Sequence, residues 1–394
     1  MRLISSIVVA FLLLGCNNRA KHIEVALQNG IEALSSGLLN NAVRFDGTDS
    51  FPRTFENGEV VCVNAYDWTS GFFAGDLWLA YELTGNDSLA YFARHYTEEL
   101  HDIKDFTGHH DLGFMIYCSY GHQWKNFHED DVKSVIVDAA TSLCTRFNPT
   151  IGQIRSWDFG EWNYPVIVDN MMNLEMLFAA TKMSGDSCFF DIAVKHADKC
   201  LENHFREDAS SYHVVSYNDD GSIESKGTFQ GFSDESSWAR GIAWTLYGFT
   251  MCFRETGFER YLKQAERIAY YIMTTVNTVD KIPYWDYNDT AIPDSPRDAS
   301  AAAITASALI ELSTMTQKGK ASKAYLSYAE DILLSLSSPE YMADPKENGG
   351  FLLKHSVSHK PLNSEIDVPL VYADYYYLEA AQRYFSLFEN RRVH

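Results

Sequence analysis

The sequence repeats a plan of two helices joined through a glycine, and this repeat restricts the fold more than any other feature. In each copy an apolar helical run ends in a glycine, and a short polar link leads into a second, amphipathic run. Gly85, Gly185, Gly257 and Gly319 stand where a helix C-terminus favours a residue with a left-handed backbone. The copies span residues 77–100, 178–201, 247–272 and 308–336, and a looser fifth copy around Gly121 spans 115–143.

Helical patterns at both ends of the chain, at residues 22–39 and 373–388, extend the series to six pairs. A helix pair that cannot bury its own apolar face must stack on its neighbours. Six pairs predict an all-α fold, an (α/α)6 barrel, formed by residues 22–390 as a single domain. An open solenoid is the alternative, but it usually has a more regular period than these uneven intervals. Alternating residues at 212–229 predict a small inserted β-hairpin.

The first 16 residues have the pattern of a secretory signal. One arginine precedes a run of mostly apolar residues that is too short to span a bilayer. Cys16 directly follows Leu-Leu-Gly, which resembles a bacterial lipobox, where the cysteine becomes the lipidated first residue of the mature protein. We therefore expect a lipoprotein of the bacterial cell envelope, facing the periplasm or sorted to the outer membrane. The alternative is an uncleaved N-terminal anchor.

Charge and cysteine spacing exclude several kinds of partner. The formal charge of −21 argues against nucleic acid and anionic membrane surfaces, so a lipid anchor is the one membrane contact that we expect. An anionic substrate must therefore meet a local basic pocket. The remaining cysteines lack any C-x-x-C spacing, which favours small buried thiols over disulfides and predicts no metal and no cofactor; they are Cys62, Cys118, Cys144, Cys188, Cys200 and Cys252.

Asp169 stands directly before a run, Asn170 to Met183, that is apolar on nearly every face. Such a run predicts a helix of an inner layer. One interpretation is that Asp169 caps this helix. The other follows from the upstream segment RSWDFGEWNYP, which supplies Trp157, Trp162 and Tyr164. A carboxylate walled by aromatic rings is desolvated and its pKa rises, as a general acid requires.

Asp111 follows two histidines and precedes a Leu-Gly turn into another apolar run. Alone it would be interpreted as a turn or cap residue. In a ring of helix pairs, however, Asp111 and Asp169 occupy equivalent positions before inner helices, so we expect them at the same mouth of the barrel. Two neighbouring carboxylates separate their pKa values, which yields an acid and a charged partner.

Arg240 and Trp244 are four residues apart and share one face of a predicted helix, with Gln230 and Trp238 upstream. An arginine fork suits a carboxylate and an indole suits a sugar ring. The alternative is an ordinary ion pair between Arg240 and Asp234 or Glu235.

Trp68 and His213 are candidates with ordinary alternatives. Trp68 precedes a further glycine-punctuated apolar helix and by default belongs to the core. His213 lies in the predicted hairpin and is equally well explained as a hydrogen-bonded strand histidine.

Four motifs in order, DWTSGFFAG, HHDLGF, VDNMMNL and SSWARGIAWTLYGF, resemble the unsaturated glucuronyl hydrolases, glycoside hydrolase family 88. The resemblance runs from about residue 60 to the closing helix. It implies an (α/α)6 barrel that removes the 4,5-unsaturated uronic acid from the non-reducing end of oligosaccharides made by polysaccharide lyases. It also implies that the enzyme hydrates the double bond instead of displacing the leaving group at the anomeric carbon.

The resemblance further implies the roles of the singled-out residues. Asp169 is then the general acid/base and Asp111 the second essential carboxylate. The subsite for the unsaturated sugar is lined by Trp68, His213, Gln230, Arg240 and Trp244.

The C-terminal stretch LLKHSVSHKPLNSE corresponds to a family loop near the next sugar. Ser358 and Lys360 partly fit a pattern that recognises sulfate there, and a solvated lysine loop is the alternative. Hydrolysis of unsaturated galacturonyl-rhamnose is an alternative activity. An inactive lipid-anchored glycan-binding protein is another, although pure binding needs no paired carboxylates. Unsaturated uronate-terminated oligosaccharides are the expected partners.

Overall fold

The computed structural model describes residues 2–317, 319–344 and 346–392, and within these ranges it describes side chains from residue 18 to residue 387. The predicted lipidation residue Cys16 lies outside the described side chains. In the described part of the chain, no helix has both the length and the hydropathy needed to cross a bilayer.

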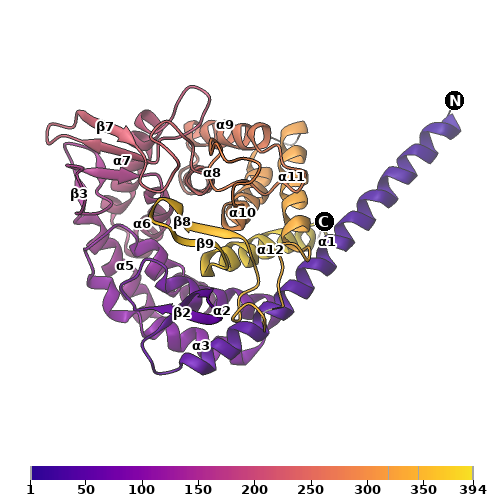
Figure 1. The fold of residues 1–394 in the computed structure, drawn as a ribbon, viewed down its shortest axis with the longest axis horizontal. Helices are drawn as coiled ribbons and strands as arrows, with labels where there is room; N and C mark the ends of the chain where they lie inside the picture. The colour runs from indigo at the N-terminus through magenta and orange to yellow at the C-terminus, as the bar shows by residue number, and fades with distance from the viewer. Residues whose placement is uncertain (1, 318, 345, 393–394) are drawn as a thin grey trace.

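The chain is mostly helical, and its helices fall into an inner and an outer set (Figure 1). The inner helices are α2 (Ser70–Thr84), the π-helical turn η2 (Gly113–Tyr117) with α4 (Tyr120–Phe127), α6 (Asn170–Ser184), α8 (Ala239–Thr256), α10 (Ala299–Met315) and α12 (Val371–Arg392). The outer helices are α1 (Arg2–Phe45), α3 (Asp87–Glu98), α5 (Asp130–Cys144), α7 (Ser187–Asn203), α9 (Glu259–Thr275) and α11 (Lys320–Leu336). Two short 3-10 helices, η1 (His101–Asp105) and η3 (Lys360–Leu362), lie in connections.

Burial explains the two sets. Helices α2, α6 and α10 are buried at almost every position of their first ten residues, because neighbours cover all their faces. Helices α3, α7 and α9 bury only one stripe and present charged residues on the other face. This is the pattern expected where one layer of helices covers another.

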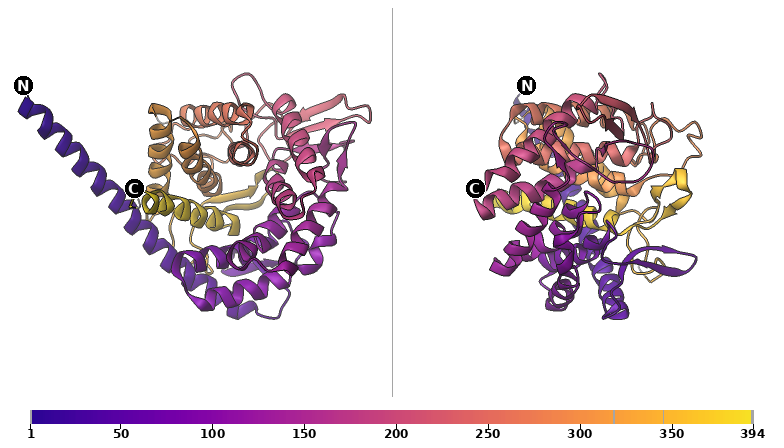
Figure 2. Two further views of the ribbon diagram at one scale, coloured as in Figure 1. Left: turned by 180° about the vertical axis from the view of Figure 1, so that it is seen from behind. Right: turned by 90° about the vertical axis from the view of Figure 1, so that its left-hand side faces the viewer.

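The inner helices contact one another in a cycle. α2 contacts η2, η2 contacts α6, and the series continues through α8, α10 and α12 back to α2. The back view in Figure 2 shows the C-terminal α12 beside the N-terminal helices, in agreement with the contacts of α12 with α1 and α2. The last inner helix, α12, therefore packs against the first inner helix, α2, and this contact closes the cycle.

Three of the predicted hairpin glycines are confirmed. Gly85, Gly185 and Gly257 end α2, α6 and α8 with φ of 69°, 79° and 69°, and the N–H of each caps its helix. The prediction for Gly319 was wrong: with φ of 179° it is extended and precedes α11. The fifth helix pair is present as α4 and α5, but its predicted glycine turn was wrong, because Gly121 lies inside α4 and the left-handed residue is His128, with φ of 55°.

The β structure is richer than predicted. The expected hairpin is present as β6 (Val214–Tyr217) and β7 (Ile223–Gly227), and β5 (Pro165–Ile167) adds a third antiparallel strand. Three further pairs were missed: β1 (Phe51–Glu56) with β2 (Glu59–Val63), β3 (Phe147–Asn148) with β4 (Gln153–Ile154), and β8 (Ser356–His359) with β9 (Ser364–Val368). The Asn57-Gly58 turn of the first pair is a strong hairpin signal that the sequence already contained.

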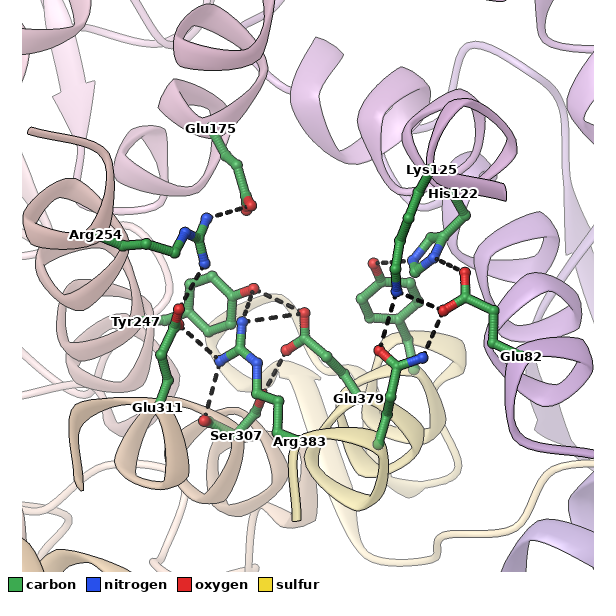
Figure 3. A network of polar contacts seen from close by, with 12 residues as sticks. Glu82, His122, Lys125, Glu175, Tyr247, Arg254, Ser307, Glu311, Glu379 and Arg383 are labelled. Carbon is green, nitrogen blue, oxygen red and sulfur yellow. Dashed lines mark hydrogen bonds and ion pairs between the residues drawn. The ribbon is translucent and has the colours of Figure 1, made fainter. Parts of the chain in front are cut away.

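The inner helices begin at one end of the molecule, where the candidate site lies, and a polar network joins them at the other end (Figure 3). Arg383 lies about 18 Å beyond Val371 along α12, at 1.5 Å per residue. Its guanidinium donates to Tyr247 Oη of α8 at 2.8 Å and to the carbonyl of Ser307 of α10 at 3.0 Å, and it pairs with Glu311 at 3.1 Å.

The opposite side of α12 is attached to α2 and α4. Glu82 of α2 accepts hydrogen bonds from Gln382 and from Lys125, and His122 bridges Glu82 and Tyr375 at 3.0 Å each. Burial raises the pKa of Glu82, but His122 and Lys125 outweigh burial and hold that pKa well below its ordinary value. The network therefore fastens the last inner helix to the first.

Candidate active site

A cavity of about 400 Å³ opens at the N-terminal end of the inner helices. Its volume is in the range of small-ligand sites. Six of the nine residues predicted for catalysis and substrate binding line this cavity, and so do two histidines that precede Asp111. The lining comprises Arg53, Tyr66, Asp67, Trp68, His109, His110, Asp111, Ser156, Trp157, Phe159, Ile167, Asp169, Phe229, Gln230, Arg240, Ser358, His359, Leu362 and Ser364.

Asp169 occupies the N-cap position of α6 without acting as a cap. Its φ of −58° is already helical, and its side chain accepts no capping hydrogen bond. Oδ2 of Asp169 is buried and accepts no hydrogen bond in the described structure. A buried carboxylate oxygen without a donor is costly, so its retention in a cavity indicates a role toward a ligand.

His213 lies against this oxygen because β5 pairs with β6. The N–H of Val168, just after β5, donates to the carbonyl of His213 at 3.1 Å. The Nδ1 of His213 accepts the N–H groups of Phe229 at 3.1 Å and Gln230 at 3.2 Å, which places the ring hydrogen of the neutral histidine on Nε2. Nε2 lies 3.5 Å from Asp169 Oδ2. His213 is thus oriented by backbone donors and faces the carboxylate.

Asp111 lies two residues before η2 and contacts both preceding histidines. His109 Nδ1 is 3.2 Å from its Oδ2 and His110 Nε2 is 3.4 Å from its Oδ1. Burial raises the pKa of Asp111, but the two histidines outweigh burial, so this pKa lies below its ordinary value. Burial lowers the pKa of His110, although Asp111 and Asp169 both oppose that effect. Asp111 therefore remains a carboxylate at neutral pH.

Arg240, the second residue of α8, is almost fully buried and supports the strand β8. Its Nη1 donates to the carbonyl of Val357 and its Nη2 to the carbonyl of Ser358 at 2.7 Å. Asp298, which caps α10, lies 3.5 Å away. The predicted alternative partners bind elsewhere: Asp234 accepts the N–H of Thr228 at 3.0 Å, and Glu235 lies 3.6 Å from Arg206. Gln230 also donates to the carbonyl of Ser358, at 3.2 Å.

The aromatic candidates separate into cavity and core. Trp68 lines the cavity, with its ring 5.0 Å from that of Tyr372. Trp157 lines it as well, and Trp162 packs on Trp157 from behind at 5.7 Å. Tyr164 lies elsewhere, where its hydroxyl donates to the carbonyls of Arg146 and Gln153.

Trp244 is fully buried between Phe114 and Tyr376 and is not among the residues that line the cavity. Four residues along a helix are also a step of about 6 Å, here into the core, and the role of Trp244 toward a substrate stays a prediction. Lys360 does not line the cavity either. It lies 3.6 Å from Asp289 and over the ring of Trp285.

Sequence reasoning missed several lining residues, and Arg53 is one of them. Its guanidinium binds Glu365 and Asp67 and reaches Ser358. These partners are 14 to 312 positions away in the chain, so no local pattern announces them. Phe229 and His359, which pack on each other from distant segments at 4.7 Å, had no local signal either, whereas Phe159 lies in the aromatic segment already singled out and stacks on Trp157.

The positive ends of several inner helices face the cavity. Asp169, Arg240 and Tyr372 are at or next to the first residues of α6, α8 and α12. Helix N-termini favour negative charge. Arg53 and Arg240 also line the cavity, where ion pairs with Glu365, Asp67 and Asp298 balance their charges. Among the residues that the structure describes, no group of three or more His, Cys, Asp or Glu side chains is arranged to hold a metal ion.

Comparison with known proteins identifies the family. The model of Glycosyl Hydrolase Family 88 matches residues 46–386. An unsaturated glucuronyl hydrolase of Formosa agariphila is 44% identical over 388 residues, which cover 95% of each chain. An unsaturated chondroitin disaccharide hydrolase of Streptococcus pneumoniae is 32% identical, covering 85% of this chain and 86% of that protein.

The crystal structure of an unsaturated glucuronyl hydrolase specific for heparin is 45% identical, covers 93% of this chain and 98% of that one, and superposes with a TM-score of 0.89. The sequence match and the structural match thus extend over the whole helical body and include the cavity. The chain belongs to glycosyl hydrolase family 88.

Proposed function

We propose that this enzyme removes the 4,5-unsaturated uronic acid from the non-reducing end of glycosaminoglycan oligosaccharides. The observation that carries the proposal is the buried, unpartnered Oδ2 of Asp169 in a cavity that also contains the charged Asp111. The activities named for the relatives from Formosa agariphila and Streptococcus pneumoniae support it. We also propose that the cycle of inner helices is the inner layer of an (α/α)6 barrel.

Asp169 acts first as an acid and then as a base. Its proton goes to C4 of the double bond, and positive charge develops at C5, where the ring oxygen stabilises it. The resulting carboxylate then takes a proton from the water that attacks C5. The hemiketal that forms opens and expels the remaining sugar. One residue can carry both steps because the first step leaves it in the form that the second requires. His213 faces this carboxylate, with Nε2 3.5 Å from Oδ2 of Asp169.

Asp111 supports this sequence as a permanent negative charge. Because its pKa lies below the ordinary value, it does not compete for the proton that Asp169 transfers. A fixed carboxylate nearby stabilises the positive charge at C5 in the transition state. The two carboxylates thereby have separate roles in one cavity.

The remaining lining residues bind the substrate. Trp68 offers an indole face to the sugar ring, and Arg240 with Gln230 shapes the wall toward the uronate carboxylate. Ser358 lies toward the following sugar. Lys360 contacts Asp289 instead of the cavity, so sulfate recognition by Lys360 requires it to leave that partner.

Heparin-derived unsaturated disaccharides are the preferred substrate in this proposal, because the 45% identical structure belongs to an enzyme specific for heparin. Chondroitin-derived disaccharides are the second candidate, on the basis of the 32% identical relative. We also propose that Cys16 anchors the mature enzyme to the bacterial cell envelope, where extracellular lyases release such fragments.

The test is the loss of ultraviolet absorbance of the conjugated uronate. Purified protein is incubated with unsaturated disaccharides from heparin, chondroitin and hyaluronan digests, each with and without sulfate. Loss of absorbance with the heparin disaccharides supports the proposal, and the sulfated arms report on Lys360. No loss with any of them, together with loss on unsaturated galacturonyl-rhamnose, would replace it with the pectin-type activity.

A further inference from the structure

Arg53 lies where the first β-hairpin and the last β-hairpin meet at the cavity. In the pairing of β1 with β2, the register shifts between Pro52 and Thr54, so Arg53 is the extra residue of a β-bulge. Bulges turn a side chain away from the regular alternation of a strand. Here the bulge directs the Arg53 guanidinium into the cavity wall, where it is largely buried.

The guanidinium connects three separate segments. Nε and Nη2 of Arg53 donate to the two carboxylate oxygens of Glu365 at 2.7 and 2.6 Å, and Nη1 donates to Asp67 at 2.8 Å. Nη2 also lies 3.4 Å from the hydroxyl of Ser358. Four of the five N–H groups of Arg53 are thus directed at protein partners, which leaves little for direct contact with a ligand.

Two partners of Arg53, Asp67 and Ser358, themselves line the cavity. Asp67 precedes Trp68, and its second oxygen accepts the N–H and the hydroxyl of Thr69 at 2.9 and 2.6 Å. Ser358 is held from the opposite side, because its carbonyl accepts from Arg240 at 2.7 Å. Arg53 and Arg240 therefore fix the two sides of the same residue of β8.

The backbone at Glu365 shows that this bond is needed. Glu365 has φ of +51°, a left-handed conformation that costs a residue other than glycine free energy. Such a conformation persists where the surroundings hold it. Bidentate bonding to a largely buried arginine is a strong constraint of this kind.

We propose that Arg53 is a positioning residue for the reaction, one that holds Trp68, Ser358 and the β9 strand together as the substrate-binding wall. This inference rests on the proposed function for the identity of the ligand. The proton transfers take place at Asp169 on another segment, so loss of Arg53 weakens substrate binding and leaves the chemical step largely intact.

Two variants test the role. Arg53→Lys keeps the charge and removes the bidentate bond to Glu365. Glu365→Gly removes the carboxylate and accepts the left-handed backbone without strain. Both are expected to raise KM for the unsaturated heparin disaccharides about tenfold, with kcat changed less than twofold. The double variant is expected to be no worse than the poorer single variant, because both changes break the same bond.

Arg260→Lys is the matched control, since Arg260 forms a similar bidentate bond with Asp198, at 2.6 and 3.0 Å, between α7 and α9 and away from the cavity. It is expected to leave KM unchanged. An unchanged KM in both cavity variants would overturn the inference, and so would a fall in kcat at constant KM.

A binding measurement separates this inference from the proposed function. Titration calorimetry in the Asp169→Asn background gives Kd for the heparin and chondroitin disaccharides without turnover. A Kd about tenfold weaker with Arg53→Lys supports the role of Arg53 even if the wild-type protein only binds the sugar. The same Kd with and without Arg53→Lys overturns it, and absence of binding by the parent protein overturns both proposals.

Discussion

The network around Arg383 yields a stability prediction whose size follows from the structure. Replacing Arg383 with methionine keeps most of the aliphatic volume and removes the charge that Glu311 and Glu379 share, at 3.1 and 3.4 Å. All three side chains are less than one fifth exposed. Removal of one partner from a buried ion pair costs about 3–5 kcal/mol. Glu311 keeps Arg254 and Glu379 keeps Tyr247, so we expect about 3 kcal/mol.

The corresponding change in Tm follows from chain length. An unfolding entropy of about 2.1 cal/mol/K per residue amounts to about 0.8 kcal/mol/K for 394 residues, so the variant should melt roughly 4 °C below the wild type. Differential scanning fluorimetry at pH 8 measures this shift. The kcat/KM should change less than twofold, because the network is at the far end of the helices from the cavity.

The pH dependence and a control make the prediction specific. In the wild type Arg383 and Arg254 outweigh burial and hold the pKa of Glu311 below its ordinary value, so this pKa rises when Arg383 is removed. The folded variant then binds more protons than the folded wild type as the pH falls, so its deficit in stability shrinks toward about pH 5. Arg260→Met, which removes the exposed pair with Asp198, should lower Tm by about 1 °C at most. Equal shifts in the two variants, or a deficit that does not depend on pH, would refute the reasoning.

Three further predictions concern other parts of the structure. Gly113→Ala would place Cβ 2.6 Å from Cα of Asn173, so the backbone that leads from Asp111 must shift and kcat/KM should fall about tenfold or more. The control Gly319→Ala, at an open extended position, should leave kcat/KM unchanged. Burial, with Asp374 nearby, raises the pKa of Asp76 well above its ordinary value, so the stability of the wild type falls as the pH rises. Asp76→Asn should therefore raise Tm more at pH 8 than at pH 5, and a difference in Tm that does not depend on pH would contradict this. Trp244→Phe should cost roughly 1–3 kcal/mol of stability and leave KM unchanged, since the indole is buried in the core. A raised KM with an unchanged Tm would show instead that Trp244 contacts the substrate.

Local signals in the sequence predicted the inner helices and the residues at their starts. Asp111, Asp169 and Arg240 were found because each precedes or opens an apolar run, and the structure places them around one cavity. The glycine signal worked at Gly85, where the left-handed backbone ends α2. It failed at Gly121, because a glycine inside a helix and a glycine after one look alike in a single sequence.

The contacts that complete the site are long-range and have no local signature. Arg53 meets Glu365 across 312 residues, and Arg240 meets Ser358 across 118. The spacing of Arg240 and Trp244 correctly put both on α8, but burial along the helix axis decides which one faces the ligand. Lys360 lies in a loop with left-handed and 3-10 geometry, and its side chain is near Asp289. Composition alone does not reveal the geometry of this loop.

The central claim, that Asp169 transfers the proton in the hydrolysis of an unsaturated uronate, is tested by one comparison. The rate of loss of ultraviolet absorbance is measured for wild type and Asp169→Asn on the unsaturated disaccharides, with Tm as the control for folding. Asparagine keeps the shape and cannot give or take the proton, so kcat should fall by about 10²–10⁴ while Tm stays unchanged or rises. A wild-type rate in a correctly folded Asp169→Asn variant would contradict the assignment.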